Sequence, residues 1–152
     1  MNTLLTFQHL ETSDDVRAAY AVMKELRPHL VSADAFAEQV EAQRAQAYHL
    51  LGVFDGERLL GLAGYRYMTN LIYGRFIYVD DLVVAADNKR GGVGSKLLGE
   101  VRKIARDAGC ANFVLDTGLH MPLAQRFYFR NGMLAKGMHF TESLATSDEV
   151  RR

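Results

Sequence analysis

Residues 75–117 read RFIYVDDLVVAADNKRGGVGSKLLGEVRKIARDAGCANFVLDT, and this stretch predicts the fold. It opens on an apolar run broken by Asp80 and Asp81, continues through a glycine-rich loop into an amphipathic helical pattern, and closes on a short apolar segment at 112–117. A strand, a helix and a second strand in this order form a crossover unit, so we expect the two strands to be parallel. The near-continuous apolarity of the first strand is typical of a strand covered on both faces.

One strand and two helices are predicted at the start of the chain. Residues 3–10 can form the strand. Ser13, followed by two aspartates, is predicted as the N-cap of an amphipathic helix that ends before Pro28. Ser32 begins a second helix. The apolar stripe of the first helix consists of Val16, Tyr20, Met23 and Leu26.

The middle of the chain has the pattern of paired strands. Tyr48–Phe54 and Arg58–Met68 are predicted to pair through a tight turn at Asp55-Gly56. A second turn near Tyr73-Gly74 leads into the apolar strand at 75–85. An antiparallel meander therefore precedes the crossover unit.

The end of the chain adds a helix from Pro122 to Arg130 and a terminal strand at Leu134–Thr141, and residues 145–152 are predicted to be a frayed tail. We therefore predict an α/β fold of the mixed α+β kind in a single domain over 1–152, with a mostly antiparallel central sheet of about six to seven strands. Helices are expected on both faces of the sheet, and the parallel βαβ crossover comes late in the chain.

Charge and composition argue against several classes of protein. The chain has 18 basic and 18 acidic residues, so its formal net charge is zero and nothing favours binding to nucleic acid or to a membrane surface. No apolar run reaches the roughly 18 residues of a membrane span. The start of the chain lacks the layout of a secretory signal, and Cys110 is the only cysteine, so we expect a cytoplasmic protein without an internal disulfide.

The loop Lys89-Arg90-Gly91-Gly92-Val93-Gly94-Ser95 leaves a strand and enters a helix. Its glycines let backbone N–H groups approach an anion closely, while the helix N-terminus and the nearby cationic side chains add positive charge. The loop is therefore a candidate pyrophosphate cradle, with a tight structural turn as the alternative. A Walker loop is disfavoured because Ser95 precedes Lys96, and a dinucleotide fingerprint because Leu97 stands where its third glycine belongs.

Two stretches of the chain contain motifs with fixed spacing. Leu82-Val83-Val84 followed by Lys89-x-x-Gly92-Val93-Gly94 resembles motif A of the GCN5-related N-acetyltransferase (GNAT) family, in which arginine or glutamine is usual at the position of Lys89. Ala124-Gln125-Arg126-Phe127-Tyr128 with Gly132-Met133 resembles the family segment Ala-x-x-Phe-Tyr-x-x-x-Gly-Phe, with methionine in place of the last phenylalanine. Met121 stands where the family commonly has an asparagine. The predicted element order follows the family over nearly the whole chain.

The resemblance implies acetyl-CoA as co-substrate. Backbone groups of Leu82 and Val84 would pair with the pantetheine arm, and N–H groups from Arg90 to Ser95 would hold the pyrophosphate. We expect no metal, because the sequence has no His/Cys/Asp cluster with ligand spacing. The implied cofactor-binding residues are Leu82, Val83, Val84, Lys89, Arg90, Gly91, Gly92, Val93, Gly94, Ser95, Gln125 and Tyr128.

Catalysis in this family is a direct attack of a neutral amine on the thioester, which requires a base for the amine and an acid for the leaving thiolate. Tyr128 matches the position of a tyrosine that commonly protonates the thiolate, and a core tyrosine on an aromatic helix is the alternative. The candidate bases are Asp80, Asp81 and His120.

The two aspartates lie in mid-strand, where an unpaired buried carboxylate is costly. Because successive strand residues point to opposite faces, Asp80 and Asp81 are not expected to face the same pocket. An ion pair with Arg66 or Arg75 is the structural alternative for either aspartate, and a solvated loop position is the alternative for His120.

The acceptor is expected to be a small amine or a peptide amine, held by aromatic residues and carboxylates of the first helices and hairpins. A homodimer is one predicted assembly. The alternatives to an enzyme are a catalytically silent acyl-CoA-binding or partner-binding module of the same fold and a plain α/β interaction domain. The candidate acceptor residues are Tyr65, Tyr67, Tyr73, Phe76, Arg66, Arg75, Glu25, Glu38 and Glu41.

Overall fold

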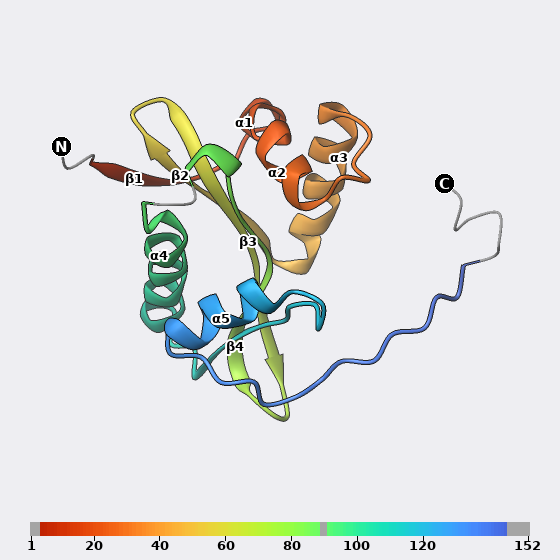
Figure 1. Ribbon diagram of the computed structural model, residues 1–152. Coiled ribbons are helices and arrows are strands. Elements are labelled where there is room, and N and C mark those ends of the chain that lie inside the picture. Colours follow the sequence, from red (N-terminus) through yellow and green to blue (C-terminus); the bar gives the residue numbers. More distant parts are fainter. Residues whose placement is uncertain (1–3, 89–90, 146–152) are drawn as a thin grey trace. The chain divides into compact units, whose positions relative to one another are not determined.

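The structure, a computed structural model, describes residues 4–88 and 91–145, so the predicted cofactor contacts Lys89 and Arg90 lie outside the described residues. The chain divides into two units, Met1–Leu115 and Asp116–Arg152. The first unit contains β1 (Leu5–His9), α1 (Ser13–Ala18), α2 (Tyr20–Leu26), α3 (Ala33–Gln43), η1 (Arg44–Gln46), β2 (Tyr48–Asp55), β3 (Arg58–Asn70), β4 (Gly74–Val84), η2 (Ala86–Asn88), α4 (Val93–Asp107) and β5 (Asn112–Leu115) (Figure 1). The second unit contains α5 (Pro122–Arg130).

The strands of the first unit form one mixed sheet in the order β1-β2-β3-β4-β5. The first four strands pair antiparallel, whereas β4 and β5 are parallel from Phe76↔Asn112 to Val79↔Leu115. The predicted meander and the late crossover, β4-α4-β5, are confirmed. Turns follow the expected chemistry, since Gly56 and Gly74 have φ angles of 61° and 65° at the two hairpins.

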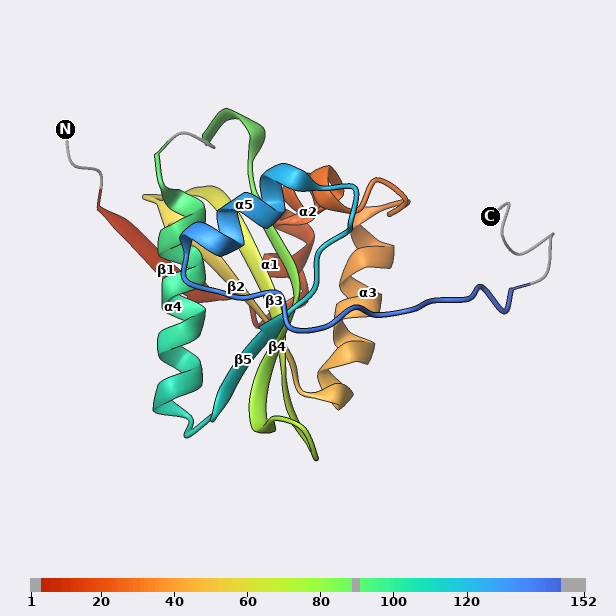
Figure 2. The same ribbon diagram turned by 60° about the horizontal axis from the view of Figure 1, so that its bottom comes forward.

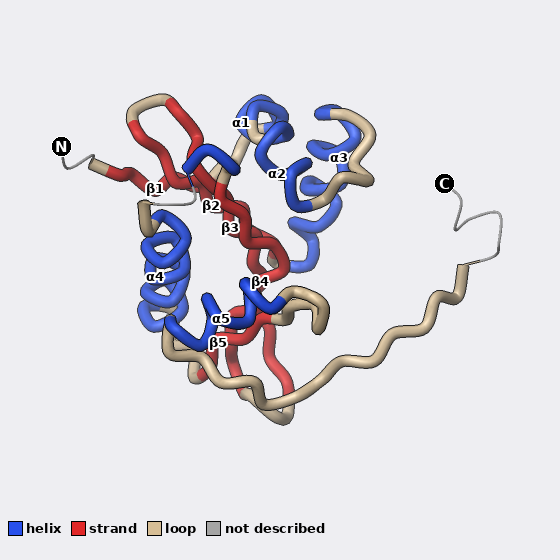
Figure 3. Tube along the Cα trace, viewed as in Figure 1, coloured by secondary structure: helices blue, strands red, loops and turns tan. Residues whose placement is uncertain are grey.

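The predicted strand count was too high, because the described residues contain five strands and residues 134–141 are not among them (Figure 3). Leu134, Met138 and Phe140 give this segment a strand-like alternation, yet they are 75%, 68% and 87% exposed. Alternation describes which side chains share a face, but a strand exists only where its backbone groups pair with a neighbour. The terminal-strand prediction was therefore wrong for the described segment.

Helices cover both faces of the sheet in the first unit, with α4 on one face and α1, α2 and α3 on the other (Figures 1 and 2). The buried residues on the α1–α3 face are Leu10, Val16, Ala19, Met23, Phe36, Ala37, Val40, Tyr48, Leu50, Leu62 and Val83. Those on the α4 face are Leu51, Val53, Leu60, Ala63, Tyr65, Ile77, Val79, Val93, Leu97, Val101 and Ala105.

The start of the first helical region differs from its prediction. Thr12, rather than Ser13, is the N-cap, because the Thr12 hydroxyl accepts a hydrogen bond from the Asp15 amide at 3.1 Å. The predicted single helix is two helices that meet at Ala19, where the chain leaves one helix and begins the next. Ser32 caps α3 as predicted, through a 3.0 Å bond from the Ala35 amide. Within the described residues, no helix combines the length and the apolarity that crossing a membrane requires.

Candidate active site

A β-bulge in β4 sets the geometry of the candidate site. Gly64 pairs with Asp81 and Tyr65 pairs with Val79, so Asp80 is an extra residue with no partner of its own on β3. The alternation of side chains along β4 shifts by one residue at the bulge. Ile77 and Val79 before the bulge and Leu82 and Val84 after it all pack on the α4 face.

The bulge therefore turns both Asp80 and Asp81 toward the α1–α3 face, and the two side chains line one pocket. The prediction that they cannot share a pocket was wrong. The physical reason is that the two-residue alternation of a strand holds only while its register is unbroken.

Asp80 forms a two-pronged ion pair with Arg66. Its Oδ2 accepts from Arg66 Nε and its Oδ1 from Arg66 Nη2, both at 2.8 Å. The side chains of Asp80 and Arg66 are 21% and 25% exposed, so the pair is largely shielded. The hydrogen bonds to Asp80 raise the pKa of the Arg66 guanidinium above its ordinary value. The ion pair with Arg66, which the sequence predicts as the structural alternative for either aspartate, is confirmed for Asp80.

Asp81 is held by Arg27, which follows α2, and by Tyr48 of β2. Arg27 donates from Nε to Asp81 Oδ1 at 3.0 Å and from Nη2 to the Asp80 carbonyl oxygen at 2.8 Å. The Tyr48 hydroxyl donates to Asp81 Oδ2 at 2.8 Å. Burial, together with the negative charge of Asp81, raises the pKa of the Tyr48 phenol well above its ordinary value. Tyr48 therefore acts as a fixed hydrogen-bond donor at neutral pH.

The pocket beneath these carboxylates, which we call the β4 pocket, has a volume of about 360 Å³. Its wall combines the acidic pair of β4 with apolar side chains of α2 and α3 and with polar side chains around the loop after α2. The lining residues are Met23, Arg27, His29, Leu30, Phe36, Gln39, Val40, Gln43, Tyr48, Asp80 and Asp81.

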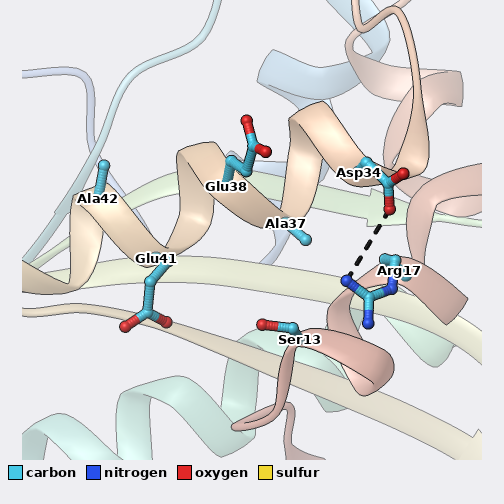
Figure 4. Close-up of a pocket in the computed structure, with 7 residues that line it drawn as sticks. All are labelled: Ser13, Arg17, Asp34, Ala37, Glu38, Glu41 and Ala42. Carbon is cyan, nitrogen blue, oxygen red and sulfur yellow. Dashed lines mark ion pairs between the residues drawn. The ribbon is translucent and has the colours of Figure 1, made fainter.

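A second pocket, of about 420 Å³, lies between α1 and α3 (Figure 4). Glu38 and Glu41, which were predicted at the acceptor site, line this pocket and not the β4 pocket. Arg17 lies 3.9 Å from Asp34 across it. Although it is larger, it contains none of the predicted catalytic or cofactor-binding residues, so the β4 pocket is the better candidate. The second pocket is lined by Ser13, Arg17, Asp34, Ala37, Glu38, Glu41 and Ala42.

Two of the predicted acceptor aromatics, Tyr65 and Tyr67, lie on the α4 face of the sheet. Tyr65 packs on the α4 face, where its hydroxyl lies 2.7 Å from His9 Nε2 and its ring stacks on His49 at 5.4 Å. Tyr67 joins the same aromatic group through an edge contact with His49 at 5.3 Å. Both tyrosines are therefore on the side of the sheet opposite to the β4 pocket.

The C-terminal part of β4, residues 80–84, has an edge that β5 does not pair with. The parallel pairing ends where Val79 meets Leu115, and β4 continues to Val84. The Ala85 amide donates to the Leu60 carbonyl at 2.8 Å, so by antiparallel alternation the N–H and C=O groups of Leu82 and Val84 point away from β3. These are the backbone groups that the sequence predicts as contacts of an extended pantetheine arm.

The N-terminus of α4 has the features of an anion site. Gly92 is its N-cap, with a φ of 70° that favours glycine and with no side-chain cap. Lys96 makes the first bond into the helix, to the Gly92 carbonyl at 3.1 Å, so the N–H groups of Val93, Gly94 and Ser95 have no partner within the helix. A pyrophosphate fits these donors and the helix dipole.

The remaining predicted residues, His120, Gln125 and Tyr128, belong to the second unit. Tyr128 is half-buried beside Phe127, with ring centroids 5.3 Å apart, and burial raises the pKa of its phenol. His120 is exposed in the turn before α5. The side-chain amide of Gln125 donates to the carbonyls of Gly118 and Leu119, each at 3.1 Å. The structure thus gives Gln125 a local role, and the catalytic roles of His120 and Tyr128 stay predictions.

Sequence reasoning missed three residues that build the β4 pocket: Arg27, Tyr48 and Gly64. Their partners are far away in the sequence, since Arg27 meets Asp81 across 54 positions and Tyr48 meets it across 33. Gly64 leaves the space that the Tyr48 hydroxyl fills, because a Cβ there would overlap that oxygen. The local pattern carries no signal for any of these contacts.

The first unit therefore combines a mixed sheet, a strand edge that β5 does not pair with, a helix N-terminus suited to phosphate and a pocket lined by two partly exposed carboxylates. The chain belongs to the Acetyltransferase (GNAT) family, whose profile matches residues 13–133. It is an enzyme of the N-acetyltransferase class. Members of the family transfer an acetyl group to an amine and typically take it from acetyl-CoA.

Individual relatives agree with this assignment. An uncharacterized N-acetyltransferase of Bacillus subtilis is 26% identical over 126 residues, covering 82% of this chain and 88% of the relative. An aminoalkylphosphonate N-acetyltransferase of Salmonella typhimurium is 27% identical over 136 residues, covering 88% of each. The solved structure of an aminoglycoside N-acetyltransferase in complex with CoA has the same fold, with a TM-score of 0.80 at 13% identity over 95% of this chain and 98% of that one.

Proposed function

We propose that this chain transfers the acetyl group of acetyl-CoA to the primary amine of a small acceptor that binds in the β4 pocket. The observation that carries the proposal is the bulge at Asp80, which turns two carboxylates into one pocket, on the strand whose C-terminal edge β5 does not pair with. An amine in that pocket and a thioester along that edge are then neighbours on the same strand.

The cofactor side of the proposal uses backbone groups. Leu82 and Val84 pair with the pantetheine arm, and the N–H groups from Val93 to Ser95 hold the pyrophosphate. Lys89 and Arg90 keep their predicted role of adding positive charge to this loop. The neutral pantetheine arm suits the apolar edge of β4. The anionic pyrophosphate suits the N-terminus of α4, which follows that strand.

In the proposed reaction the amine nitrogen attacks the thioester carbonyl, a C–N bond forms and the C–S bond breaks. The thiolate takes a proton, for which Tyr128 is the proposed donor. The ammonium form of the acceptor binds Asp80, whose oxygens each accept one described hydrogen bond and have capacity for another. Before the attack the ammonium loses one proton to the aspartate pair or to His120, the candidate bases, so that the neutral amine is the nucleophile. The nitrogen loses its second proton to solvent as the amide forms, and the Tyr128 phenol regains a proton from solvent.

A small acceptor is favoured over a protein tail by the size of the pocket. About 360 Å³ lies at the lower end of the range of small-molecule sites. Because one relative acts on aminoalkylphosphonates, this class of amine is one to test, beside amino acids, amino sugars and diamines. The proposed reaction requires neither a homodimer nor a cytoplasmic location, and both stay predictions from the sequence.

The test is release of free thiol from acetyl-CoA in the presence of a panel of amines, with wild type compared with Asp80→Asn and Asp87→Asn. Loss of the Asp80 charge removes a charge-assisted bond, so kcat/KM is expected to fall by about 10- to 100-fold. Asp87 is an exposed partner of Arg58 outside the pocket, so its variant controls for losing one surface carboxylate. Equal activity of wild type and Asp80→Asn would remove Asp80 from the site.

A further inference from the structure

The two kinds of polar group in the β4 pocket come from different elements. The carboxylates that accept hydrogen bonds come from β4, whereas the N–H donors come from α3 and from the segment that follows α2. We propose that the acceptor is zwitterionic: its ammonium binds Asp80, and an oxyanion on the same molecule, a carboxylate or a phosphonate, binds the donors. This inference rests on the proposed function and narrows its substrate class. The donors are Arg27, His29, Gln39 and Gln43.

Arg27 has an unused edge. Its Nε and Nη2 bond to Asp81 and to the Asp80 carbonyl, while Nη1 makes no hydrogen bond within residues 4–88 and 91–145. The Arg27 side chain is 41% exposed although one edge of it lies on β4. A guanidinium held on one edge is preorganised to bind an oxyanion on the other, because little side-chain entropy remains to be lost.

Three further N–H donors accompany this cation. Gln39 and Gln43 are one turn apart on α3, so their amides project from the same side of the helix into the pocket lining. His29 lines the pocket from the segment after α2, and an imidazole donates an N–H in either protonation state. Among the described residues, none of these three side chains has a hydrogen-bond partner, so all are available to a ligand.

The charge balance of the pocket favours a zwitterion over a polycation. Asp80 is matched by Arg66 and Asp81 by Arg27, so the pairs cancel. A ligand with one positive and one negative group keeps this balance, and each of its charges meets an opposite one. A diamine would place its second ammonium near the Arg27 cation, where the two like charges repel each other.

The experiment measures thiol release from acetyl-CoA with amines matched in the number of bonds between the two polar ends: 3-aminopropanoate, 2-aminoethylphosphonate, 3-aminopropanol and 1,3-diaminopropane. Wild type is expected to show a kcat/KM about 10- to 100-fold higher for the two oxyanion-bearing amines than for the alcohol and the diamine, as one or two charge-assisted hydrogen bonds provide. The ratio between the carboxylate and the phosphonate then identifies which oxyanion the site prefers.

Variants separate recognition from folding. Arg27→Gln, Gln43→Leu and His29→Leu are each expected to lower the ratio of the oxyanion-bearing amine to the alcohol by roughly 3- to 30-fold, mainly through KM. Gln46→Leu, on η1 and outside the pocket, should leave the ratio unchanged. Arg27 also holds Asp81, so Arg27→Gln can fail to fold. In that case Gln43→Leu and His29→Leu test the inference.

Three results are informative. Higher kcat/KM for oxyanion-bearing amines, lost in the pocket variants, supports the inference. Acetylation of the alcohol and the diamine at rates equal to those of the acids overturns it while the proposed function stands. Failure to acetylate any amine, in a protein whose melting temperature acetyl-CoA also fails to raise, overturns the proposed function and this inference with it.

Discussion

At the scale of single residues, the site depends on one absent side chain. Gly64 lies beneath the Tyr48–Asp81 hydrogen bond, and a Cβ there would overlap the Tyr48 hydroxyl and lie 2.8 Å from Asp81 Oδ2. Tyr48 is 3% exposed, so it has no solvent into which to move. The space at Gly64 is therefore a condition for the geometry of the aspartate pair.

We expect Gly64→Ala to destabilise the protein by about 1–3 kcal/mol, because overpacking forces Tyr48 away from Asp81. The free energy of unfolding in urea measures this. Gly99→Ala is the matched control: a Cβ at Gly99 in α4 meets nothing within 4 Å, so alanine should stabilise the helix by roughly 0.5–1 kcal/mol. Equal effects of the two substitutions would contradict the packing argument.

At the scale of elements, the bulge in β4 and the first turn of α4 position the proposed chemistry. The bulge moves one carboxylate across the sheet, and the glycine N-cap leaves backbone donors exposed at the start of α4. Neither feature is a property of a single side chain. The bulge arises because Asp80 is one extra residue in β4. The backbone donors are exposed because Gly92 begins α4 in a left-handed conformation without a side-chain cap.

Gly92→Ala tests the start of α4. Alanine at a φ of 70° costs about 1–2 kcal/mol, although a Cβ there meets no atom within 4 Å. The variant should unfold at lower urea and show a smaller rise in melting temperature with acetyl-CoA, because the N–H groups that bind pyrophosphate lose their alignment. Gly99→Ala, later in α4 and outside the predicted cofactor-binding residues, is the comparison, because its Cβ meets no atom within 4 Å. Unchanged acetyl-CoA stabilisation in Gly92→Ala would argue against the phosphate site.

At the scale of the whole molecule, buried phenols on both faces of the sheet link stability to alkaline pH. Burial raises the pKa of both Tyr48 and Tyr65, which are 3% and 1% exposed. Both stay protonated in the folded chain at pH values where tyrosines of the unfolded chain ionise, above about 10. Their contribution to stability is therefore complete below pH about 10 and is lost as the pH rises further.

Urea unfolding of wild type and Tyr48→Phe between pH 8 and pH 11 checks this. Tyr48→Phe should be less stable at pH 8 by about 1 kcal/mol, since it lacks the hydrogen bond to Asp81, but it should lose less stability above pH about 10. The two curves should therefore converge. Tyr73→Phe, in the β3–β4 turn, is the control for losing one phenol. Parallel curves for wild type and Tyr48→Phe would contradict the linkage.

Two predictions about the whole molecule await a measurement: the single domain and the role of Tyr128. The division at Leu115 leaves the expected single domain over 1–152 as a prediction. A single cooperative unfolding transition of the full chain, raised as one by acetyl-CoA, is the behaviour that one domain predicts. The proposed role of Tyr128 depends on the same outcome, because its helix belongs to the second unit.

The sequence by itself determined the meander, the crossover, the glycine-rich entry to α4 and the family. These follow from local rules: strand and helix periods, turn glycines, and motifs at fixed spacing. It also marked Asp80 and Asp81 as unusual, because carboxylates interrupt an apolar strand.

Only the tertiary structure decided how those carboxylates are used. A register shift against β3 turned both to one face, and Arg27, Tyr48 and Arg66 reach them from other elements. Pairing register and long-range hydrogen bonds depend on which residues meet after folding, and no local period encodes that. For the same reason the strand-like pattern at 134–141 did not make a strand: a strand needs a partner, which the pattern alone does not supply.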